Sequence, residues 1–134
     1  MRAAAFALVL LACGKDAAAP HGPTLEVTNR AYYRNCTPTC GPITAVNPLT
    51  VSIRPTDDSL NATASVAAGA TQCIQVADSV AYVYAYSQAA GLIPADSGPV
   101  NFAGSWRWVI SDTLFNGGIP QPSPSTFVAA AACS

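Results

Sequence analysis

The sequence predicts an all-β fold, an antiparallel β-sandwich of about seven strands, with a small β-barrel as the alternative. Short segments alternate apolar and polar side chains with a period of two, which is typical of half-buried strands. Eleven prolines scattered through 134 residues leave no clean window for a helix of ordinary length. Glycine- and proline-rich turn signals separate the segments, as expected for strands joined by short connections.

Four strands are expected in the first half of the domain. Residues 25–33 alternate from Leu25 onward, and residues 49–54 alternate in the same way. Residues 60–66 form a third alternating segment. A turn rich in alanine and glycine then leads into a short strand over 71–76.

The second half predicts three more strands. Residues 80–87 carry the strongest signal, because tyrosines share one face and small residues the other. Residues 91–104 contain two prolines and three glycines and are expected to form a long surface loop. A strand is then expected over residues 106–111, and it could extend as far as residue 115. The proline-rich stretch 117–124 is expected to be a rigid loop, and 126–133 a closing strand.

The sandwich is immunoglobulin-like only in a loose sense. True immunoglobulin domains place a tryptophan between two paired cysteines. Here Trp106 and Trp108 both come more than thirty residues after Cys73. No family resemblance is identified for the domain itself.

The N-terminus carries the most specific motif. Arg2 precedes a short apolar run that ends in Leu10-Leu11-Ala12-Cys13. The run is too short to cross the hydrocarbon core, which takes roughly 20 helical residues, and the layout is that of a cleaved export signal. The motif resembles the lipobox of bacterial lipoproteins.

This resemblance implies cleavage before Cys13, a diacylglyceryl thioether on its sulfur and an acyl chain on its amino group. Several chains on one residue hold a protein stably on a membrane. Gly14 rather than Asp follows the cysteine, which favours the outer membrane. The organisation expected is a signal peptide over 1–12, a lipidated tether over 13–23 and one β-sandwich domain over 24–134. The other interpretations are an ordinary secretory signal and a cytosolic protein.

The cysteine count agrees with the lipobox. Setting Cys13 aside leaves an even number of cysteines, which in an exported protein predicts two disulfides with three alternative pairings. These disulfide candidates are Cys36, Cys40, Cys73 and Cys133. A metal or redox role is disfavoured, because zinc sites usually show two-residue Cys spacings or histidine partners.

Composition argues against catalysis and against nucleic acid. The lone histidine, His21, lies in the expected tether, so a nucleophile in the domain has no histidine base. The net charge is −1 with only 10% charged residues, so nucleic acid is not an expected partner. A catalytic carboxylate pair is not expected either, because most of the acidic residues in the domain lie at turns or strand ends, where local hydrogen bonding explains them. These acidic residues are Glu26, Asp57, Asp58, Asp78, Asp96 and Asp112.

Aromatic rows are the one feature that suggests recognition. The candidate ligand-binding residues are Tyr82, Tyr84, Tyr86, Trp106 and Trp108. Rows of this kind usually pack in a core, and this is the default expectation here. Exposed rows would instead stack on sugar rings or on a partner protein.

The sequence therefore predicts a lipid-anchored protein of the bacterial cell envelope, with the outer membrane as the expected location. We expect a non-catalytic binding or structural module, without a cofactor apart from the covalent lipid on Cys13. Its partners would be the membrane, through the anchor, and either a protein or a glycan. The alternatives are a carbohydrate-binding module using the aromatic row, and a protease inhibitor or other enzyme-related role using the loop Gly117 to Pro124.

Overall fold

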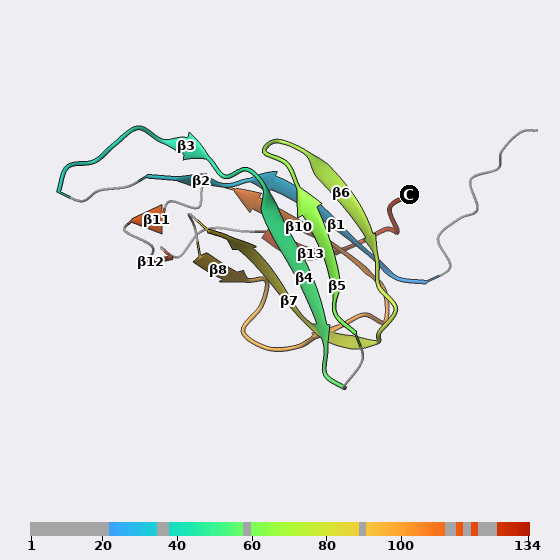
Figure 1. Ribbon diagram of the computed structural model, residues 1–134. Coiled ribbons are helices and arrows are strands. Elements are labelled where there is room, and N and C mark those ends of the chain that lie inside the picture. Colours follow the sequence, from blue (N-terminus) through green and yellow to red (C-terminus); the bar gives the residue numbers. More distant parts are fainter. Residues whose placement is uncertain are drawn as a thin grey trace, which may run out of the picture.

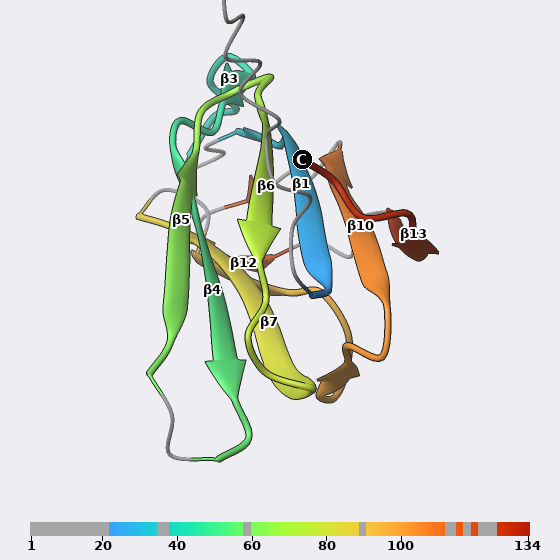
Figure 2. The same ribbon diagram turned by 90° about the vertical axis from the view of Figure 1, so that its right-hand side faces the viewer.

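The computed structural model describes residues 22–34, 38–57, 60–88, 91–111, 115–116, 119–120 and 126–134. These residues form strands and connections without a helix, which confirms the all-β prediction. Two open sheets face each other as the layers of a sandwich, seen edge-on in Figure 2. Within the described strands no sheet closes into a barrel.

The first layer, the β1 sheet, has the strand order β13-β10-β1-β6. Its strands are β1 (Thr24–Arg30), β6 (Thr71–Gln75), β10 (Ser105–Ser111) and β13 (Thr126–Ala130). The β1–β10 pair is parallel and the other two pairs are antiparallel. One parallel pair in an otherwise antiparallel fold is a departure from the fully antiparallel prediction.

The second layer, the β7 sheet, has the order β5-β4-β7-β8, with β9 also paired to β7. Its strands are β4 (Leu49–Pro55), β5 (Ala62–Val66), β7 (Val80–Ser87), β8 (Gly91–Pro94) and β9 (Val100–Asn101). Two small hairpins lie at one end of the sandwich (Figure 1). They are β2 (Tyr32–Tyr33) with β3 (Thr44–Ala45), and β11 (Phe115–Asn116) with β12 (Ile119–Pro120).

The core lies between the inward faces of the two sheets. The β1 sheet contributes large side chains such as Leu25 and Trp108, whereas β7 contributes Ala81, Val83 and Ala85. All five are at most 2% exposed. Small residues on β7 therefore face the side chains of the opposite layer, and the alternation sends the tyrosines of β7 outward.

Asn29 is a fully buried polar residue at the junction of the two layers. Its Nδ2 donates to the carbonyls of Val46 and Val66, at 2.9 and 3.0 Å, and its Oδ1 accepts from the Ala31 amide at 3.1 Å. These bonds connect β1 to the segments before β4 and at the end of β5. They satisfy a polar side chain that is 0% exposed.

A disulfide on the outer face of the β1 sheet links the C-terminal residues to β6. Cys73 lies on β6, at one edge, and Cys133 follows β13, at the other edge. The last residues cross from β13 back toward β6, and on the way the Cys133 amide donates to Thr24 Oγ1 at 2.9 Å. Thr24 also bonds Ser105, and it is 1% exposed. We call residues 131–134 the C-terminal strap.

Several predicted boundaries are wrong for local physical reasons. The expected loop over 91–104 contains β8 and β9, because Ile93 and Val100 pair with β7 and enter the core. The first strand ends at Arg30, where the Asn29 side chain captures the Ala31 amide in a turn. The closing strand ends at Ala130, where the strap begins. The third strand begins at Ala62, after the 94%-exposed Leu60.

Candidate functional site

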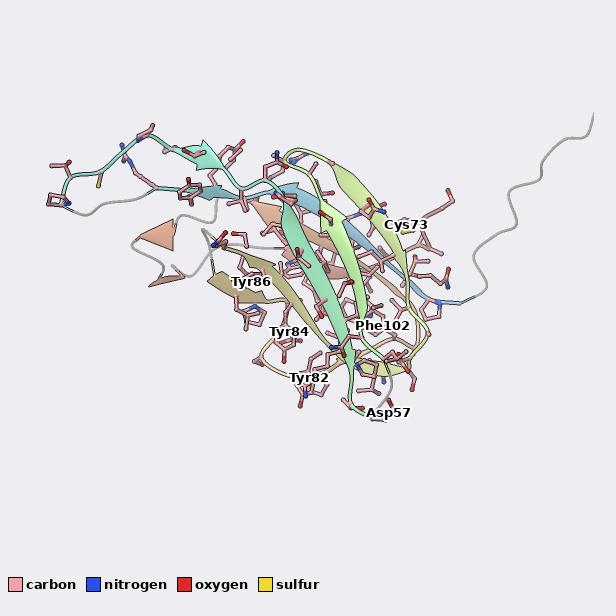
Figure 3. The ribbon with its side chains drawn as sticks, in the orientation of Figure 1. Asp57, Cys73, Tyr82, Tyr84, Tyr86 and Phe102 are labelled. Atoms are coloured by element: carbon pink, nitrogen blue, oxygen red, sulfur yellow. A yellow bond between two sulfur atoms is a disulfide. The ribbon has the colours of Figure 1, made fainter. Side chains whose placement is uncertain are left out.

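The three tyrosines of β7 face outward, so the default expectation that they pack in the core is wrong. Tyr82 is 37% exposed and Tyr86 is 50% exposed, while the alternate residues of β7 are buried. Figure 3 shows Tyr82, Tyr84 and Tyr86 following one another along the strand. The rings of Tyr82 and Tyr84 are stacked, with centroids 6.2 Å apart and 13° between their planes.

Strand pairing sets the neighbours of this aromatic row. On one side, Thr50, Ser52 and Arg54 of β4 lie opposite Tyr86, Tyr84 and Tyr82 respectively. On the other side, Pro94 and Leu92 of β8 lie opposite Tyr84 and Tyr86. We call this outer surface of the β7 sheet the tyrosine face, and its strands β4, β7 and β8 are held by the core beneath them. It comprises Thr50, Ser52, Arg54, Tyr82, Tyr84, Tyr86, Leu92 and Pro94.

A shallow groove of about 400 Å³ runs over the tyrosine face. It is lined by Thr50, Ser52, Arg54, Asn61, Tyr84, Tyr86 and Leu92. Aromatic and aliphatic side chains from β7 and β8 form one wall, and hydroxyl, amide and guanidinium groups form the other. Aromatic surface with a few convergent polar groups is the usual composition of a ligand site.

Charge is distributed unequally between the two outer faces. Of the lining residues that the structure describes, Arg54 alone is charged, and its side chain is exposed. On the β1 sheet, Arg107 donates from Nε to Glu26 Oε1 at 2.5 Å, so that cation is compensated. Within the described part of the chain Arg54 forms no ion pair.

The two tryptophans belong to the core, so they do not form the recognition row that the sequence suggested. Trp108 is 0% exposed, and its ring meets Phe127 edge-on with centroids 6.3 Å apart. Trp106 is half-buried, stacks on Phe127 with centroids 4.7 Å apart, and donates from Nε1 to the Asn101 carbonyl. Their alternation was interpreted correctly as one shared face, but that face is the inward one.

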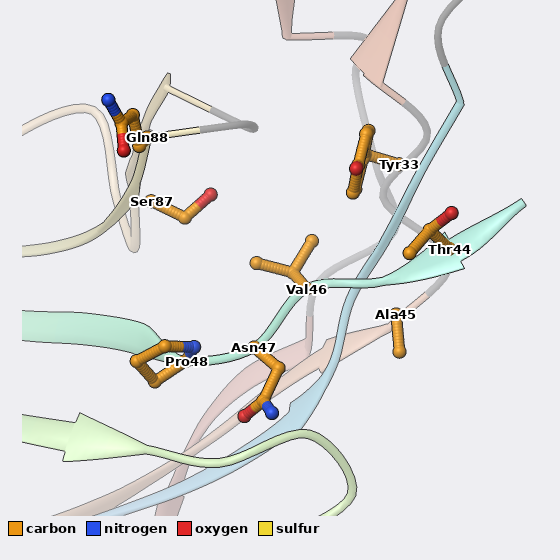
Figure 4. A pocket seen from close by; sticks show the side chains of 8 residues that line it. All are labelled: Tyr33, Thr44, Ala45, Val46, Asn47, Pro48, Ser87 and Gln88. Carbon is orange, nitrogen blue, oxygen red and sulfur yellow. The ribbon is translucent and has the colours of Figure 1, made fainter.

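A second pocket of about 570 Å³ lies beside the β2–β3 hairpin (Figure 4). Its lining residues are Tyr33, Thr44, Ala45, Val46, Asn47, Pro48, Ser87 and Gln88. The Asn47–Pro48 peptide bond is cis, and Asn47 Oδ1 accepts from the Ala68 amide. The lining holds no charged group, so it offers less chemical selectivity than the groove. Sequence reasoning missed this pocket because it is built from a connection rather than from a periodic strand.

Three of the four predicted disulfide cysteines lie in the described part of the chain, and all three are disulfide-bonded. Cys73 and Cys133 form a disulfide, and Cys40 is disulfide-bonded as well. Cys13, His21, Cys36, Asp58, Asp112 and most of the loop 117–124 lie outside the described residues. Among the residues that the structure describes, no three His, Cys, Asp or Glu side chains gather where they could hold a metal ion.

The chain has no match among the family models, the curated proteins or the solved structures. In the described part of the chain there is no helix with the length and apolar character needed to span a membrane.

Proposed function

We propose that this protein is a lipid-anchored, non-catalytic binding module of the bacterial cell envelope that holds a glycan on its tyrosine face. The observation that carries the proposal is the outward-facing row of exposed Tyr82, half-buried Tyr84 and exposed Tyr86 beside the polar residues of β4. A folded domain rarely leaves such a row in water without a ligand, because aromatic side chains gain much from burial.

Sugars match both walls of the groove. The C–H faces of a pyranose ring stack on aromatic rings, and its hydroxyls exchange hydrogen bonds with side-chain hydroxyls and amides. Tyr84 and Tyr86 supply the rings, while Thr50, Ser52 and Asn61 supply donors and acceptors. Because all of these residues except Asn61, which directly precedes β5, stand on paired strands, little backbone conformational entropy is lost when a ligand binds.

The anchor explains how the face would be presented. Thr24 and Cys133 meet at one end of the sandwich, and the β2–β3 hairpin lies at the other end (Figure 1). A lipid on Cys13 places the Thr24 end toward the membrane. The tether over 13–23 reaches at most roughly 40 Å when extended. The tyrosine face then runs along the side of the domain, where envelope polymers can reach it.

A glycan array with the purified domain tests the ligand class. We expect Tyr84→Ala and Tyr86→Ala to abolish binding without loss of the folded state, as followed by circular dichroism. Tyr32→Ala is the matched control, because Tyr32 is also exposed, at 40%, but lies on β2 away from the groove. Failure of the domain to bind any glycan would contradict the proposal.

The anchor is tested separately by Cys13→Ser. This variant should move from the membrane fraction to the soluble or precursor pool. An intact mass of the membrane-extracted protein should match Cys13 to Ser134 plus acyl chains. A variant that stays on the membrane would refute the lipid anchor and leave the binding face untouched.

A further inference from the structure

The two long sides of the groove on the tyrosine face differ in their chemistry. Its β4 side presents Thr50, Ser52 and Arg54, and its β7 and β8 side presents Tyr84, Tyr86 and Leu92. Tyr86 lies four positions after Tyr82, so the aromatic row extends about 13 Å at the rise of a strand. This length suits a few consecutive sugar rings rather than a single one.

One charged group faces this row. Arg54 stands opposite Tyr82 in the strand pairing, and it is the single ionic residue among the described residues of the lining. A guanidinium presents its N–H groups as a planar fork that matches a carboxylate in a bidentate manner. None of the described lining residues is an acid, so none of them competes with a ligand carboxylate for the exposed Arg54 side chain.

The sparse charge also indicates which polyanion fits. Nucleic acid binding depends on several lysines or arginines that neutralise successive phosphates. This groove has one cation, and the whole chain has a net charge of −1. A hydroxyl-rich glycan that carries sugar carboxylates meets both Arg54 and the polar wall.

We infer that the groove selects an acidic glycan, with a sugar carboxylate on Arg54 and sugar rings on Tyr84 and Tyr86. The inference rests on the proposed function and narrows its ligand class. It separates the roles of the residues: the tyrosines supply affinity for sugar in general, and Arg54 supplies the preference for uronic acids.

The test compares an oligogalacturonide with the same oligosaccharide after reduction of its carboxyl groups, by titration calorimetry on the full folded domain. We expect the acidic form to bind about ten-fold more tightly, as for a hydrogen bond to a charged group. Arg54→Gln should remove this difference, and Arg54→Lys should retain part of it. Arg30→Gln, an equal change of charge at an exposed position of β1, should leave the preference intact.

The outcomes distinguish the two proposals. Equal binding of both forms by the unaltered protein, still lost in Tyr84→Ala, overturns the acidic preference and leaves glycan binding standing. An acidic preference that survives Arg54→Gln overturns the role of Arg54. Poly-L-glutamate that binds as well as the oligogalacturonide overturns the glycan class in favour of an acidic protein. Absence of binding by either oligosaccharide overturns the glycan function itself.

Discussion

The two outer faces of the sandwich come from the same alternating pattern and end in opposite states. On the β1 sheet, the C-terminal strap crosses the surface, a disulfide fixes it, and Glu26 compensates Arg107. On the β7 sheet, the tyrosines remain exposed, and Arg54 has no ionic partner within the described residues. The fold therefore covers one outer face with its own chain and leaves the other open to solvent.

The junction between the layers should be the most sensitive position. Asn29→Ala removes three hydrogen bonds that a fully buried side chain makes to backbone groups in the interior. We expect the free energy of unfolding to fall by about 3 to 5 kcal/mol, measured by urea denaturation. Asn101→Ala is the control, because within the described residues the Asn101 side chain accepts a single hydrogen bond, from the exposed Ala103 amide. Equal denaturation midpoints for the two variants would refute the role of Asn29.

The stability of the outer face of the β1 sheet, which the C-terminal strap covers, depends on the Cys73–Cys133 disulfide. Replacing Cys73 and Cys133 together by Ser should lower the free energy of unfolding by about 2 to 4 kcal/mol, since the bridge closes a loop with a sequence separation of 60. Limited proteolysis should then cleave near the C-terminus earlier. Ligand binding on the tyrosine face should stay unchanged. A loss of binding equal to that of Tyr84→Ala would show that the two faces are coupled.

The open face should contribute least to stability. Tyr86→Ser should change the free energy of unfolding by less than about 1 kcal/mol, because the side chain is already half exposed. Trp108→Ala, on the inward face of the other sheet, should cost about 3 to 5 kcal/mol. Urea denaturation of both variants measures the contrast. Comparable losses of unfolding free energy in the two variants would mean that Tyr86 stabilises the fold, which would contradict this prediction.

Much of the fold could be predicted from the period of two. Strands β4 and β7 were located almost to the residue, because their apolar residues alternate without interruption. Strands β8 and β9 were missed because each is four residues or fewer, and the prolines and glycines around them favour a loop. Their pairing with β7 is a tertiary contact that local sequence does not encode.

The site was harder to predict than the fold. Alternation shows that Tyr82, Tyr84 and Tyr86 share a face, but the choice between inward and outward depends on the volume that the opposite sheet supplies. Trp108 and Leu25 supply it here, so small residues point inward. Asn29 carried a usable signal, because it falls on the same parity as Leu25 and Val27, and a polar residue at such a position is expected to be a bonded buried group.

The strap also changes how the domain responds to mechanical load. A pull on the chain ahead of residue 24 is delivered to Thr24, the first residue of an inner strand. At that point the Thr24 side chain is bonded to Ser105 and to the Cys133 amide, beside the covalent link to β6. Force therefore passes to β10 through Ser105 and to β6 through the Cys133–Cys73 link before β1 can be drawn out.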